Sequence, residues 1–499
     1  MILEGILAVL LSPVCLLLIT LGVIVGIIFG SIPGLSATMA VVLFLPMSFG
    51  MEPINGISLL MGLYIGGISG GLISAILLKI PGTPSSIATI FDGGPMAEKG
   101  EAGKALGIGI LYSFIGGIIS VIALIFISPS LADFALKFTP VEYFSIAIFS
   151  LTIIASLSGD SMINGLLSGL LGILIAMIGI APLDGYMRFT FGIHHLTSGF
   201  DILTVLIGLF AVSDIIRFSY QKTTGQTGKV KEYKIKGFGV SLKEFKEQFW
   251  NMIRSSLIGL GVGILPGVGG STSSILAYSA TKNASKYPEK FGTGIIDGVV
   301  ASESSNNATT GGALIPLLTL GIPGNTVTAM LLGGLLIHGI SPGPLIFKNN
   351  GVVMYAIFTA LIVANIAMLI FEYAGLKYFV KLMDIPKSIL FPIIMVLCAV
   401  GAFGGNSRVF DVWSIFIFGV VGYLFIKANI SSTPFIIGFI LGPIAEVNLR
   451  RALMASDGSL IPFLTRPISA LFLVAAVVSV ALVVKKNLKK KDGAAPDAI

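Results

Sequence analysis

Four short Pro-Gly sequences, each beside small polar residues, interrupt the hydrophobic sequence of this chain. They are GSIPGLSATMA (30–40), KIPGTPSSIAT (79–89), GILPGVGGSTSS (263–274) and LGIPGNTVTA (320–329). In a bilayer, a backbone N–H or C=O group without a partner costs several kcal/mol. Broken helices are therefore tolerated where they line a cavity, and in a sequence they are the best indication of a transport site.

The residues at these breaks could bind an anion and a cation. The N-terminus of a half-helix offers free N–H groups and about half a positive charge, and oxygen atoms at the breaks could coordinate sodium. The alternative is that the polar residues only cap helices or bond between them. The candidate substrate-binding residues are Gly34, Ser36, Thr38, Gly82, Thr83, Ser85, Gly267, Ser271, Thr272, Asn306, Asn307, Gly324, Asn325 and Thr326.

The run ESSNNATTGG (303–312) holds the most distinctive side chains. Amides can bond to protein and still offer an oxygen to a cation, so Asn306, Asn307 and Thr326 are candidate sodium ligands. Alanine at Asn306 or Asn307 should lower uptake and leave stability nearly unchanged, unless these amides are interhelical bonds. Glu303 is a proton-coupling candidate, because ionisable residues inside membrane segments are usually functional. Capping of a turn or an interfacial position is the alternative for Glu303.

Other reactive side chains favour no catalytic site and no cofactor. No His-based motif accompanies the Ser-rich breaks, so an intramembrane hydrolase is disfavoured. The three histidines have no partners at metal-ligand spacing, and Cys15 and Cys398 have neither disulfide nor metal spacing. Asp92 is expected in a loop.

The amino-acid composition indicates that membrane-spanning helices position these residues. The chain has 499 residues, of which 55% are hydrophobic and 11% charged, whereas a soluble domain carries about 25% charged residues. The net charge of +7 comes from residues between apolar runs, so it indicates cytoplasmic loops in contact with lipid headgroups and not nucleic-acid binding. We predict an all-α integral membrane protein with about 11–13 transmembrane helices and broken or re-entrant hairpins in two inverted repeats.

The expected organisation follows the order of the breaks. Gly22, Gly26 and Gly30 should share one packing face of the first helix. Basic residues place the linker and the tail in the cytoplasm. The broken helices of the two halves should meet near the bilayer midplane. The expected parts are a first repeat (1–218, hairpins at 30–50 and 79–90), a basic linker (219–250), a second repeat (251–484, hairpins at 263–281 and 303–330, plus closing helices) and a tail (485–499).

Four motifs occur in order along the chain: GSIPGLSATMAVVLFLP, KIPGTPSSIATIFDGGPMAEKGEAGKAL, GILPGVGGSTSS and GVVASESSNNATTGGALIPLLTLGIPG. Together they resemble the large membrane subunit of the tripartite tricarboxylate transporter family. The resemblance implies a secondary active permease of the prokaryotic inner membrane that takes up di- or tricarboxylates, or related organic anions, with a cation gradient. It also implies two partners, a small membrane subunit and an extracytoplasmic solute-binding protein.

Two features of the mechanism stay open from the sequence. Uncharged, oxygen-rich breaks favour sodium over a proton relay, with proton-coupled uptake as the alternative. A passive channel or scaffold subunit, the alternative function, would use similar spans without coupling. A second copy of this chain is a further candidate partner.

Overall fold

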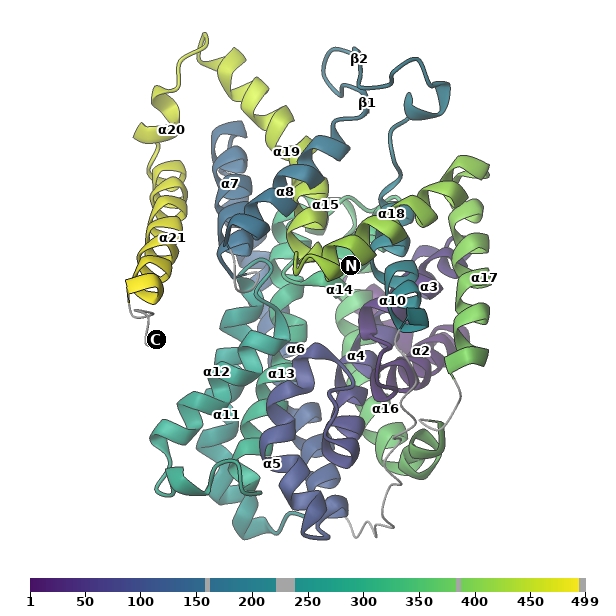
Figure 1. Ribbon diagram of the computed structural model, residues 1–499, viewed down its shortest axis with the longest axis vertical. Coiled ribbons are helices and arrows are strands. Elements are labelled where there is room, and N and C mark those ends of the chain that lie inside the picture. The colour runs from purple at the N-terminus through teal and green to yellow at the C-terminus, as the bar shows by residue number, and fades with distance from the viewer. Residues whose placement is uncertain (158–161, 221–237, 383–386, 493–499) are drawn as a thin grey trace, which may run out of the picture. The chain divides into compact units, whose positions relative to one another are not determined.

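Helices form nearly all the regular structure in the computed structural model, which describes residues 1–157, 162–220, 238–382 and 387–492 (Figure 1). Among these residues, the only strands are β1 (Gly179–Ile180) and β2 (Met187–Arg188), which pair antiparallel. The predicted all-α fold class is confirmed. Most of the predicted basic linker, 221–237, and the end of the predicted tail, 493–499, lie outside the described residues.

The chain divides into two compact units, and each contains segments from both halves of the sequence. Unit 1 comprises Met1–Ala135 and Leu203–Tyr423. Its helices are α1 (Ile2–Leu10), α2 (Pro13–Ser31), α3 (Ala37–Ser48), α4 (Pro53–Leu78), η1 (Pro84–Ser86), α5 (Ile87–Glu98), α6 (Ala102–Ala135), α9 (Ile202–Leu206), η3 (Ile207–Val212), α10 (Ser213–Tyr220), α11 (Leu242–Ile264), α12 (Gly269–Ala284), η4 (Pro288–Lys290), α13 (Ile296–Leu320), α14 (Thr326–Ile337), α15 (Ile346–Asn349), α16 (Gly351–Leu382), α17 (Lys387–Asn406) and most of α18 (Val409–Lys427).

Unit 2 comprises Leu136–Ile202 and Leu424–Ile499. Its elements are α7 (Pro140–Leu157), α8 (Met162–Ala176), β1, β2, η2 (His194–Leu196), α19 (Ser432–Ala455), α20 (Ile461–Thr465) and α21 (Pro467–Asp492). The predicted repeat boundaries and the predicted inversion stay predictions.

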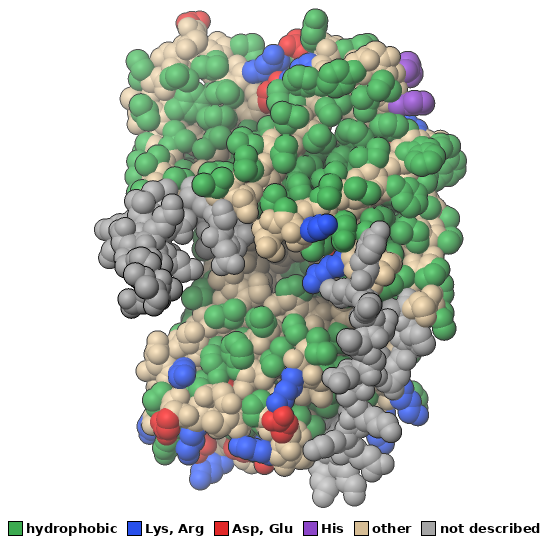
Figure 2. All heavy atoms as spheres, viewed as in Figure 1, with side chains coloured by type: hydrophobic (Ala, Val, Ile, Leu, Met, Phe, Trp, Pro, Cys, Tyr) green, Lys and Arg blue, Asp and Glu red, His purple; other side chains and the backbone are tan. Residues whose placement is uncertain are grey.

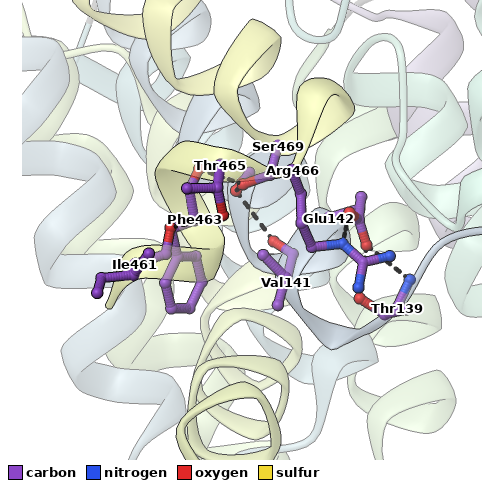
Figure 3. Close-up of polar contacts among 9 residues, drawn as sticks. Thr139, Val141, Glu142, Ile461, Phe463, Thr465, Arg466 and Ser469 are labelled. Atoms are coloured by element: carbon purple, nitrogen blue, oxygen red, sulfur yellow. Dashed lines mark hydrogen bonds and ion pairs between the residues drawn. The ribbon is translucent and has the colours of Figure 1, made fainter. Parts of the chain in front are cut away.

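An ion pair between the buried Glu142 and the exposed Arg466 holds α7 against the segment between α20 and α21 in unit 2 (Figure 3). Arg466 Nε donates to Glu142 Oε1 at 2.6 Å, and Glu142 Oε2 accepts from both the backbone N–H (2.8 Å) and the hydroxyl (2.6 Å) of Thr139. The Ser469 hydroxyl donates to the Phe463 carbonyl at 2.8 Å. These contacts fix the packing of unit 2 and contain none of the candidate site residues.

Seven helical segments of the described chain are long and apolar enough to cross a membrane. They are Pro13–Ser31, Pro53–Leu78, Ala102–Ala135, Ile202–Ser219, Gly351–Leu382, Val409–Lys427 and Ser432–Ala455. Six shorter apolar helices accompany them, including α3 and α14. Hydrophobic side chains dominate the face drawn in Figure 2. The chain is therefore a multi-pass membrane protein, while the predicted number of 11–13 spans stays a prediction.

Helices end at all four Pro-Gly sequences. α2, α4, α11 and α13 end at Ser31, Leu78, Ile264 and Leu320, a few residues before the respective prolines. Proline removes a backbone N–H and clashes with the preceding helical turn. Gly34 and Gly267 have φ of 97° and 75°, the left-handed region that favours glycine. The last break is shorter than the expected hairpin over 303–330, because α13 is continuous and only 321–325 is non-helical.

Glycines let α2 approach α4 closely, as the spacing of Gly22, Gly26 and Gly30 predicts. A Cβ atom at Gly22 or Gly26 would lie 2.5 Å from the Leu59 carbonyl oxygen or 2.6 Å from the Leu63 carbonyl oxygen. Such contacts leave no room for a side chain, so the glycine face is confirmed as a packing surface.

Candidate functional site

The first and fourth breaks are followed by helices α3 and α14, whose first turns lie side by side. Ser36 caps α3 by accepting from Met39 N at 3.1 Å, and Asn325 caps α14 by accepting from Thr328 N at 2.8 Å. The hydroxyls of Thr38 and Thr326 are 3.3 Å apart. The capping residues satisfy backbone groups that a helix start leaves free.

The third break contacts the fourth break directly, and the second break contacts α12, the helix that follows the third break. Gly267 N donates to the Gly324 carbonyl at 2.8 Å, linking the third break to the fourth. The Ser274 hydroxyl of α12 donates to the Ser85 carbonyl at 2.9 Å, linking α12 to the second break. Unit 1 thus brings all four breaks together, and with them the candidate residues that lie on them.

Helix α13 supplies the polar wall beside the breaks. Every residue from Gly298 to Thr319 is buried. Among these, Glu303 accepts hydrogen bonds from the hydroxyls of Thr89 on α5 and Ser113 on α6, the latter at 2.9 Å. The Glu303 side chain is fully buried within α13, so it does not cap the start of this helix.

The adjacent amides of α13 have different surroundings. Asn307 Nδ2 donates to Ser113 Oγ at 2.8 Å and to the Glu303 carbonyl at 3.2 Å. In contrast, neither polar atom of Asn306 makes a hydrogen bond of normal geometry within the described residues, although the residue is only 1% exposed; the Glu303 carboxylate lies near enough for a weaker polar interaction. A buried, unsatisfied amide costs about 1–3 kcal/mol, so a ligand that bonded to Asn306, both of whose polar atoms are unsatisfied, would recover that free energy.

Asp92 lies in α5 and is fully buried, so the prediction that it is a loop residue is wrong. Its Oδ1 accepts from the backbone N–H groups of Gly292, Gly294 and Ile295 at 2.8–3.0 Å. Its Oδ2 accepts from Tyr278 OH at 2.8 Å. The Asp92 carboxylate therefore anchors the start of α13. These partners satisfy its oxygens, so the charged side chain can be buried although it lies in a helix.

Glu372 of α16 is a further buried carboxyl group, and it is not among the site residues predicted from the sequence. It accepts from the Ser69 hydroxyl of α4 at 2.6 Å, and its Oε1 has no partner in the described part of the chain. The signal was present, because an ionisable residue inside a long apolar run indicates function or a specific partner. Across the described ranges, no three His, Cys, Asp or Glu side chains are grouped to hold a metal ion.

The broken helices and their buried polar lining define a multi-pass helical membrane protein of the transporter class. Residues 16–437 match the family described as "Tripartite tricarboxylate transporter TctA family", and the chain belongs to this family. Membership implies that it is the large subunit of a tripartite system that also has a solute-binding protein and a small membrane subunit.

Two relatives from Agrobacterium vitis are similar to this chain. An uncharacterized 52.8 kDa protein in the TAR-I ttuC' 3' region is 36% identical over 481 residues, which cover 96% of this chain and 95% of the relative. An uncharacterized protein in the TAR-II ttuC' 3' region is 37% identical over 230 residues, which cover 46% of this chain and 95% of that relative. No solved structure matches the chain.

Proposed function

We propose that this chain is the permease through which a binding-protein-dependent system takes up di- or tricarboxylates, or related organic anions, with a sodium gradient. The observation that carries the proposal is the convergence of four broken helices beside a buried polar helix in unit 1. Half-helix N-termini can hold an anion without a buried lysine, and oxygens at the same breaks can hold sodium.

Sodium is preferred over protons because the residues at the breaks are hydroxyls, amides and carbonyls. Thr38 and Thr326, with hydroxyls 3.3 Å apart, offer two neighbouring oxygens for a cation. Glu303 is already held by hydroxyl donors from two other helices. It is the residue that a proton-coupled mechanism would use, so proton coupling is the second candidate.

The system should include the binding protein and the small membrane subunit, and it should reside in the inner membrane of a prokaryote. Family membership supports the three-component arrangement. The linker around Lys231 and the tail should face the cytoplasm, because both are rich in lysine.

The test is uptake by proteoliposomes that contain all three components. Radiolabelled succinate, malate and citrate are supplied with an inward sodium gradient, and then with an imposed proton gradient in sodium-free buffer. We expect accumulation only with sodium, and little at micromolar substrate when the binding protein is omitted. Proton-driven accumulation without sodium would transfer the coupling role to Glu303. Equilibration without accumulation under either gradient would favour a channel.

A further inference from the structure

The third break differs from the first at the position where a helix cap belongs. Aligning Pro33-Gly34 with Pro266-Gly267 places Ser36 opposite Gly269 and Ala37 opposite Gly270. Ser36 caps α3 by accepting from Met39 N. Glycine has no side chain that could do the same, and no side chain in the described structure caps α12.

The first backbone N–H groups of α12 are therefore available to a ligand. The first four N–H groups of a helix have no partner inside the helix, and they carry the positive end of its dipole. Ser271 and Thr272, in this first turn, are partly exposed. The N-terminus of this 16-residue helix is thus accessible as well as uncapped.

The Asn306 side chain points at this helix start. Its Oδ1 lies 2.9 Å from the place where a Cβ atom would stand on Gly270, and the Cβ of Ser85 lies at the same distance from that place. Both polar atoms of Asn306 lack hydrogen bonds of normal geometry within the described residues, although the residue is 1% exposed. The amide oxygen and nitrogen can exchange places by a flip, so the nitrogen can donate in the same direction.

The matching position in the first half is filled. Aligning Pro81 with Pro323 places Tyr64 of α4 opposite Asn306 of α13. Tyr64 OH donates to the Thr310 carbonyl and accepts from Asn325 Nδ2, each at 3.3 Å. A bulky ring with a satisfied hydroxyl therefore stands where the second half has an unpartnered amide.

We propose that one carboxylate group of the transported anion binds at the start of α12, held by its free N–H groups and the Asn306 amide, and that the matching position at α3 binds none. This inference rests on the proposed function. It assigns Asn306 to the anion and not to sodium. It also predicts that the duplicated fold has one such anion site per chain.

The first experiment exchanges the Asn306 amide for a carboxylate of the same shape. Asn306→Asp puts a negative charge where the anion should bind. Uptake is measured with whichever of succinate, malate and citrate the wild type takes up best, and it should fall about a hundredfold. This is the upper part of the range expected when hydrogen bonds to a charged ligand are lost. The half-saturating sodium concentration should not fall. Preserved carboxylate uptake with tighter sodium binding would make Asn306 a cation ligand and overturn the inference.

A second test variant, Gly270→Ala, and two control variants separate binding from folding. Ser12→Asp adds a carboxylate at the N-cap of α2, where Ser12 already accepts from Cys15 N, and it should leave uptake unchanged. Gly270→Ala places a Cβ atom 2.9 Å from both Asn306 Oδ1 and Ser85 Cβ, which is too close, so it should displace the Asn306 amide and reduce uptake at least tenfold. Gly261→Ala on α11 has no atom within 4 Å of the new Cβ and should have no effect.

The outcomes distinguish this inference from the proposed function. If the wild-type system accumulates none of the carboxylates, the proposed function fails. If the wild type accumulates a carboxylate and both Asn306→Asp and Gly270→Ala, folded with normal melting temperatures, take it up at the wild-type rate, only the anion site at α12 is refuted.

Discussion

Helices α4 and α13 occupy matching places in the two halves, and they pack alike while differing in polarity. When the Pro-Gly breaks are aligned, Gly70 corresponds to Gly312, and Ile27 corresponds to Leu260. A Cβ atom at Gly70 would lie 2.6 Å from the Ile27 carbonyl oxygen, and one at Gly312 would lie 2.6 Å from the Leu260 carbonyl oxygen. The helix contacts thus recur in the same register in both halves.

The polar side chains do not recur. Around Tyr64, helix α4 is apolar and glycine-rich, whereas the corresponding part of α13 carries Glu303, Asn306 and Asn307. The two halves therefore share these backbone contacts, while the side chains that face the breaks differ. This comparison predicts that variants of the shared contacts have matching effects in the two halves, and that variants of the polar residues do not.

The largest loss of stability is expected for Asn307→Ala. This change removes donors from the Ser113 hydroxyl and the Glu303 carbonyl and leaves buried groups less satisfied, at about 1–3 kcal/mol for each group left without a partner. Thermal unfolding of the purified protein in detergent measures the loss.

The matched variant is Asn306→Ala, which breaks no hydrogen bond within the described structure. Removing an unsatisfied buried amide relieves a cost of about 1–3 kcal/mol, which offsets the cavity that alanine leaves, so the variant should be about as stable as the wild type or more stable. Its uptake should fall about tenfold to a hundredfold. Equal loss of stability in both variants would mean that both amides are bonds between helices.

The positions of the breaks were predictable from sequence, but the assignment of the two amides was not. Pro-Gly interrupts a helix through local chemistry, so Pro33, Pro81, Pro266 and Pro323 mark the helix ends that the structure shows. Adjacent residues on a helix point about 100° apart, so Asn306 and Asn307 must face different neighbours. Which neighbour each one meets depends on helices distant in the sequence.

The polar run 303–312 and Asp92 were harder to predict for a related reason. Serine, threonine and asparagine have low helix propensity, yet α13 is continuous through the run because tertiary packing on all sides overrides that preference. Asp92 precedes two glycines and looks like a loop residue, yet it is buried in α5. Its partners are backbone groups about 200 residues later, which no local pattern indicates.

Alanine at the matching glycines should have an intermediate effect that is equal in the two halves. Gly70→Ala and Gly312→Ala each place a Cβ atom against a backbone carbonyl that cannot rotate away. Overpacking of this kind costs about 1–3 kcal/mol, so both melting temperatures should fall by similar amounts. Gly261→Ala, whose Cβ meets open space, is the control. A loss confined to one half would show that the matching contacts do not contribute equally to stability.

The smallest effect on uptake is expected for Tyr64→Phe, which tests whether the first half contains a second anion site. The change keeps the ring that fills the position and removes only the hydroxyl, which bonds to the Thr310 carbonyl and Asn325 Nδ2. The Thr310 carbonyl then loses this donor and the Asn325 amide nitrogen loses this acceptor; because both bonds are long, at 3.3 Å, stability should fall by about 0.5–1.5 kcal/mol. Uptake per folded molecule, and the substrate concentration that half-saturates it, should stay at the wild-type value, because no carboxylate is bound beside α4. A tenfold loss of uptake with normal stability would instead mean that Tyr64 contacts the substrate. Both α4 and α13 would then contribute to substrate binding, and the proposal that only the second half binds a carboxylate would be wrong.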